Sequence, residues 1–254
     1  MYYFISVLAA TEVIFMSAIH PRFLASIISA DKRISFIGCF VQSFAACASG
    51  IAESNLLAFM AIDRDLAVNR PLHYSAFMTR TVCIGLSVIS WIIGIIIMLV
   101  DTTLTANLHF CGPNTIDNLF CDPPSLQVLA CSDISFKNVV TVVLSIIGNG
   151  VPFCIIIAAY IRIMKTITTI KSAVGKRKAF STCSSHLIVA GLYYITVSAV
   201  YFNPNSNTFK KYITLMFTLI SPVLNPFIYT LRNKDVKKAL RKSKLLKIYL
   251  NFNH

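Results

Sequence analysis

Charged side chains stand at unusual positions in this 254-residue sequence. The triplet Asp63-Arg64-Asp65 ends a long apolar run, and two carboxyl residues, Glu12 and Glu53, lie inside such runs. A charge inside hydrocarbon is costly, so charged residues there usually pair with one another or mark ion and proton sites. The triplet could form a local ion pair. The two carboxylates could hold a sodium ion or share a proton.

Composition shows why these charges stand out. The chain is 56% hydrophobic and 13% charged, with a mean hydropathy of +0.70. A soluble domain averages about 25% charged residues and could not bury this much apolar surface. The composition therefore predicts a membrane protein.

Six segments are apolar over about 20 residues, which is the length of a helix that crosses a bilayer. Each must be helical, because only a helix satisfies its own backbone hydrogen bonds in lipid. The segments cover approximately 1–24, 34–60, 81–101, 138–163, 183–202 and 212–230. The sequence thus predicts an all-α membrane bundle, with a long loop at 102–137 and a tail at 231–254.

The basic residues predict how the bundle is oriented. Of the 23 Lys and Arg residues, 17 fall in the loops and tail of one side, which is therefore expected to be cytoplasmic. This distribution explains the net charge of +13 without a nucleic-acid partner. The C-terminus is then cytoplasmic, and six spans place Met1 on the same side. We interpret this as a bundle that lacks an initial helix.

The tail is expected to contact membrane lipid. Leu240, Leu245, Leu246 and Ile248 fall partly on one helical face, with lysines opposite. Such a pattern favours a helix lying on the anionic inner leaflet.

Cysteines define the long loop. Cys111, Cys121 and Cys131 lie on the outer, oxidising side, where disulfides persist, and Cys39 is near the same end of the second span. Four cysteines allow three pairings. Joining Cys39 to Cys121 would pin the loop over the bundle, and Cys111 and Cys131 could then close a smaller loop. A metal site with His109, Cys111, Cys121 and Asp122 is the alternative. The other four cysteines, Cys47, Cys83, Cys154 and Cys183, are expected to be small buried hydrophobes.

Five stretches, taken in order, resemble one family. They are "MYYFISVLAA", "AFMAIDRDLAVNRPLHY", "LFCDPPSLQVLACSD", "KAFSTCSSHLIV" and "SPVLNPFIYTLRNKDVKKAL". Together they look like an odorant receptor of the rhodopsin-like G-protein-coupled family. The first stretch resembles the opening of the family's second helix, so the resemblance implies a seven-helix bundle without its first helix.

The sequence also departs from the family pattern. Asp63-Arg64-Asp65 stands where the family usually has Asp-Arg-Tyr, and Glu12 replaces a more usual aspartate. Variants of this kind resemble fish odorant receptors.

The resemblance implies a function and three sets of residues. A small, mainly apolar odorant would bind, and a stimulatory, olfactory-type G protein would be activated. The activation switch and coupling surface would comprise Asp63, Arg64, Tyr160, Lys178, Asn225, Pro226 and Tyr229. The ion or proton site would comprise Glu12, Glu53, Ser221 and Asn225. The ligand would contact Ser43, Ala46, Cys47, Gly50, Ile51, Leu144, Ser145, Thr196, Val197 and Val200.

Three other classes of function are alternatives for this sequence: a transporter, an enzyme and a receptor fragment. A small transporter would also have several spans and buried carboxylates, but inverted repeats are not evident. Nucleotide-binding, zinc-protease and serine-hydrolase motifs are absent from the sequence, so neither an enzyme nor a cofactor is expected. A non-functional receptor fragment is the remaining alternative.

Overall fold

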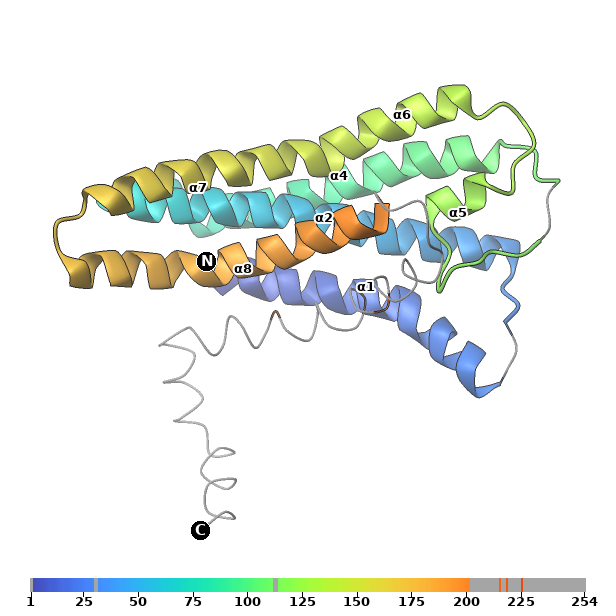
Figure 1. Ribbon diagram of the computed structural model, residues 1–254, viewed down its shortest axis with the longest axis horizontal. Coiled ribbons are helices and arrows are strands. Elements are labelled where there is room, and N and C mark those ends of the chain that lie inside the picture. Colours follow the sequence, from blue (N-terminus) through green and yellow to red (C-terminus); the bar gives the residue numbers. More distant parts are fainter. Residues whose placement is uncertain are drawn as a thin grey trace, which may run out of the picture.

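The computed structural model describes residues 2–29, 32–111 and 114–201, together with Leu215, Thr218 and Asn225. These residues form a helical bundle, as predicted (Figure 1). The long elements are α1 (Tyr2–Ile28), α2 (Phe36–Asn69), α4 (Arg80–Ala106), α6 (Ser135–Ser145), α7 (Val151–Thr169) and α8 (Ala173–Tyr201). The short ones are α3 (Tyr74–Phe77), α5 (Pro123–Gln127) and a π-helical turn, η1 (Ile146–Gly150).

Helix α2 is the centre of the bundle and packs against α1, α4, α7 and α8. In the most apolar 18-residue stretch of α2, 72% of the residues are buried inside the bundle, whereas in that of α4 only 33% are buried. The loop that carries α5 covers one end of the bundle, and the α7–α8 connection lies at the other (Figure 1). We call these the loop end and the Arg64 end, since α2 runs from Phe36 at the former to Asp63-Arg64-Asp65 near the latter.

A close approach of two backbones fixes the position of α4 against α2. A Cβ atom added at Gly94 would lie 2.4 Å from the carbonyl oxygen of Ala48, which is closer than real Cβ atoms come. Only glycine therefore fits at this crossing. Small residues at helix crossings are the usual means of tight packing in membranes.

The sequence Ile146–Gly150 widens into η1 because Pro152 lacks the N–H that would bond to the carbonyl of Gly148. The N–H of Val151 bonds instead to the carbonyl of Ile146. Asn55 on α2 donates to the Gly148 carbonyl at 3.4 Å and to its own helix at Ile51, 2.9 Å. The polar side chain thus stabilises the irregular turn.

Several helices extend beyond the membrane spans predicted from the sequence. The structure has four helices long and apolar enough to cross a membrane in its described part, at Tyr3–Ile28, Phe36–Asn69, Arg80–Ala106 and Ser135–Thr169, and a shorter apolar helix at Cys183–Ala199. Helices α2 and α8 extend well beyond the predicted spans 34–60 and 183–202. In α2 the added turns carry Asp63, Arg64 and Asp65, which are buried and have polar partners. The basic run from 173 onward is therefore helix α8 and not a loop. Apart from Leu215, Thr218 and Asn225, the predicted span 212–230 lies outside the described residues, as does the whole tail 231–254.

Candidate functional site

The Asp63–Arg64 pair predicted from the sequence is present and buried. Arg64 donates to Asp63 Oδ2 from Nη2 at 2.5 Å and from Nε at 3.1 Å, and the side chains are 8% and 1% exposed. Tyr74 on α3 donates to the other carboxylate oxygen at 2.7 Å. Burial, and then this bond to a carboxylate, raise the pKa of the Tyr74 phenol above its ordinary range. Both oxygens of Asp63 therefore accept hydrogen bonds.

Asp65 turns away from this arrangement and joins α2 to α7. Its carboxylate accepts a hydrogen bond from Asn69 at 2.6 Å and lies 3.4 Å from the guanidinium of Arg162. Thr166 on α7 in turn donates to Asn69. Asp65 therefore has partners of its own in place of Arg64, a detail that the sequence left open.

Tyr160 lies in α7, and its hydroxyl contacts α8. It donates to the carbonyl oxygen of Cys183 at 2.9 Å and lies 2.9 Å from His186 Nδ1. His186 Nε2 is 3.0 Å from the carbonyl oxygen of Leu57 on α2, to which the Nε2–H tautomer would donate. In that tautomer Nδ1 accepts, and the single phenol proton of Tyr160 is shared between Cys183 O and Nδ1. The resemblance implied that Tyr160 acts with Arg64, and His186 was not predicted as a site residue. A histidine in an apolar helix is the signal that could have identified it.

Glu12 and Glu53 are both buried, at 4% and 6% exposure. Asn225 donates from its side-chain amide to Glu12, which brings a residue 213 positions away to this carboxylate. Glu53 lies close enough to Glu12 to interact with it electrostatically. Three members of the predicted ion or proton site are thus gathered. Ser221, like Pro226 and Tyr229 of the predicted switch, lies outside the described residues.

The predicted ligand residues are distributed over several clusters. Cys47, Ile51 and Leu144 pack together around Met98, and Ala46 packs with residues of α1. Val197 borders a third cluster, and Thr196 donates to its own helix at Leu192, 2.6 Å away. Gly50 accepts from Tyr193 through its carbonyl, and Ser145 is exposed. Ser43 lies at the loop end. The side chains of Val200 and Lys178 lie outside the described residues.

Two disulfides close the loop end, Cys39–Cys121 and Cys111–Cys131, with Cα–Cα distances of 5.4 and 5.8 Å. This is one of the three pairings that the sequence allowed, and it contradicts the metal-site alternative because two of that site's ligands are consumed. Gln42 strengthens the attachment, since it accepts from Cys121 N at 3.1 Å and donates to the Ala18 carbonyl at 3.1 Å.

The four remaining cysteines are free, and they are not all buried. Cys83 and Cys183 are buried as predicted, whereas Cys47 is partly exposed and Cys154 is exposed. The prediction for Cys154 was wrong because α7 presents that position on its outer surface, where a small apolar residue is equally suited to lipid.

A buried ion pair at the loop end was missed. Lys137 Nζ on α6 lies 3.1 Å from Asp101 Oδ1 on α4, and the residues are 3% and 4% exposed. Thr141 donates to the same oxygen at 2.8 Å. The sequence interpretation placed both charged residues at or beyond the ends of spans and counted only Glu12 and Glu53 as buried acids.

Comparison with known proteins identifies the family. The sequence model of the olfactory receptor family matches residues 1–247. Human olfactory receptor 10A7 is 41% identical over 246 residues, which are 96% of this chain and 78% of that receptor. Chimpanzee olfactory receptor 1A1 is 45% identical over 244 residues, or 95% of this chain and 79% of that receptor. The chain therefore belongs to the olfactory receptor family of multi-pass plasma-membrane G-protein-coupled receptors.

Proposed function

We propose that the chain binds a small, mainly apolar odorant and activates a heterotrimeric G protein of the stimulatory, olfactory type. The loop end would face outward, and the Arg64 end and the C-terminus would face the cytoplasm, in agreement with the distribution of basic residues. The observation that carries the proposal is the Asp63–Arg64 pair, buried at the far end of α2 from the disulfide-closed loop. In this position Arg64 can be held by Asp63 in one state and released toward a G protein in another.

The test is a signalling assay in cells that supply the G protein. Cyclic AMP is measured across an odorant panel for the parent and for Arg64→Gln, with surface delivery measured in parallel. We expect the evoked signal to fall by at least about tenfold at equal surface level, since removing one partner of a buried charge pair costs about 2–5 kcal/mol. Arg70→Gln is the matched control, because Arg70 is exposed just beyond the same helix. An Arg64→Gln receptor that signals like the parent would contradict the switch.

We also propose that Glu12, Glu53 and Asn225 form a buried site for a sodium ion or a shared proton. The contact between Asn225 and Glu12 and the burial of both carboxyl groups support it. In Glu53→Gln, the dependence of odorant potency on sodium concentration should disappear if an ion is bound. A sodium dependence equal to that of the parent would contradict a bound sodium ion and favour a shared proton.

A further inference from the structure

Asp101 is only half satisfied by the residues around it. Its Oδ1 atom accepts from both Lys137 and Thr141, whereas Oδ2 is buried and has no hydrogen-bond partner in the described part of the chain. An unpaired buried acceptor loses the hydrogen bonds that water would provide, which makes the unbound state unfavourable. A bound group that donates one hydrogen bond would remove this penalty.

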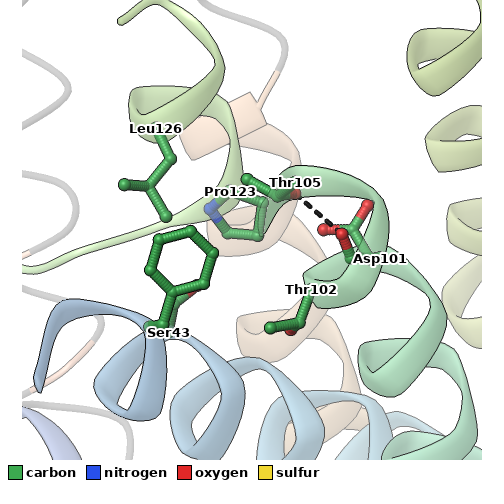
Figure 2. A pocket seen from close by; sticks show the side chains of 7 residues that line it. Ser43, Asp101, Thr102, Thr105, Pro123 and Leu126 are labelled. Carbon is green, nitrogen blue, oxygen red and sulfur yellow. Dashed lines mark hydrogen bonds between the residues drawn. The ribbon is translucent and has the colours of Figure 1, made fainter. Parts of the chain in front are cut away.

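Asp101 also forms part of the wall of a crevice between α2, α4 and α5 (Figure 2). Phe40, Pro123 and Leu126 supply apolar surface, and Thr102 adds a hydroxyl. Thr105 lines the crevice too, but its hydroxyl already donates to the backbone carbonyl of Asp101 at 2.7 Å (Figure 2). The crevice is thus lined by apolar side chains, by hydroxyl groups that include that of Ser43, and by Asp101, whose Oδ2 atom lacks a donor.

We propose that this crevice receives the polar head of the odorant and that Asp101 Oδ2 accepts a hydrogen bond from a neutral hydroxyl group. The inference rests on the proposed function and narrows the ligand class to alcohols.

The charges around Asp101 favour an uncharged polar group on the ligand. Lys137 already pairs with Asp101, so an ammonium group would have to compete with Lys137 for the same carboxylate, and burying a second cation is costly in a low dielectric. A carboxylate would approach Asp101 with the same sign of charge. An ether or aldehyde carries no donor and would leave Oδ2 unpaired. An alcohol alone among these groups meets the acceptor without adding charge.

Entry requires the crevice to open. It is narrower than a water molecule in this conformation, so the hydroxyl must displace Pro123 and Leu126 from α2 and α4. The Cys39–Cys121 disulfide keeps this segment attached to α2 while it moves.

The experiment uses the full chain and a panel of straight-chain, branched and aromatic alcohols, each paired with its methyl ether, amine and acid. Binding is read as the rise in unfolding temperature of the purified protein in lipid nanodiscs, and signalling as cyclic AMP in cells. We expect alcohols to be effective at about tenfold lower concentration than their ethers, the effect of one hydrogen bond to a charged group.

Two variants test the role of Asp101. Asp101→Leu combined with Lys137→Met removes the acceptor together with its counter-ion, and such replacements of buried pairs often fold well. This double variant should respond equally to alcohols and ethers. Asp133→Asn is the matched control, since Asp133 is an exposed carboxylate beyond the crevice that bonds to Ser135, and it should keep the preference.

Equal effects of alcohols and ethers on the parent, or a preference that survives in the double variant, would overturn the inference. An alcohol-selective rise in unfolding temperature without cyclic AMP would support the anchor and count against G-protein coupling. Cyclic AMP responses to the ethers with no advantage for the alcohols would support G-protein coupling and count against the anchor at Asp101.

Discussion

Two buried carboxylates at opposite ends of the bundle have different arrangements of partners. Asp63 at the Arg64 end is paired with its neighbour on the same helix, and both of its oxygens accept hydrogen bonds. Asp101 at the loop end is paired with Lys137 on another helix, 36 residues away, and one of its oxygens has no partner in the described part of the chain. The partners of Asp63 named here, Arg64 and Tyr74, come from α2 itself and from the short helix α3. The second arrangement ties α4 to α6 and leaves one acceptor for a further group.

The two charge pairs are expected to differ in how much they contribute to stability and to function. A local pair can open without unpacking α2 from its neighbours, which suits a switch. An interhelical pair contributes to the packing itself, because each charge compensates the burial of the other. We therefore expect single substitutions to damage the fold most at the loop end.

The largest effect is expected for Lys137→Met. This change leaves the carboxylate of Asp101 buried with only the neutral hydroxyl of Thr141, and the free energy of unfolding should fall by about 3–5 kcal/mol. The measurement is thermal unfolding of the purified protein in nanodiscs. Adding Asp101→Leu to Lys137→Met should restore most of the loss. If the double variant is no more stable than Lys137→Met alone, the loss comes from packing and the interhelical pair carries little energy.

The sequence predicted local pairs better than distant ones. The Asp63–Arg64 pair joins adjacent residues on one helix, so neighbouring letters are enough to suggest it. The Asp101–Lys137 pair depends on the lengths and rotations of α4 and α6, which hydrophobic patterns do not determine to within a residue. For the same reason the contact of Tyr160 with His186 was missed. The disulfides lie between these cases, because oxidising surroundings limited the cysteines to three pairings.

The smallest effect is expected for Tyr74→Phe, which removes one neutral donor from Asp63 and leaves Arg64 in place. The free energy of unfolding should fall by about 1–2 kcal/mol, the contribution of one hydrogen bond to a charged group. Because the raised pKa of Tyr74 keeps the phenol protonated in the folded state, this contribution should be full below the ordinary phenol pKa of about 10. It should be lost as the pH rises through the higher folded value.

Unfolding of the parent and of Tyr74→Phe is therefore compared from neutral to alkaline pH. Tyr3→Phe is the control, because it removes a phenol hydroxyl from α1 and leaves the hydrogen bonds of Arg64 and Tyr74 to Asp63 in place. A difference between parent and Tyr74→Phe that grows with rising pH would contradict a Tyr74 pKa that is higher in the folded than in the unfolded state. A difference of zero at neutral pH would mean that the Tyr74 hydroxyl contributes nothing to the stability of the charged pair.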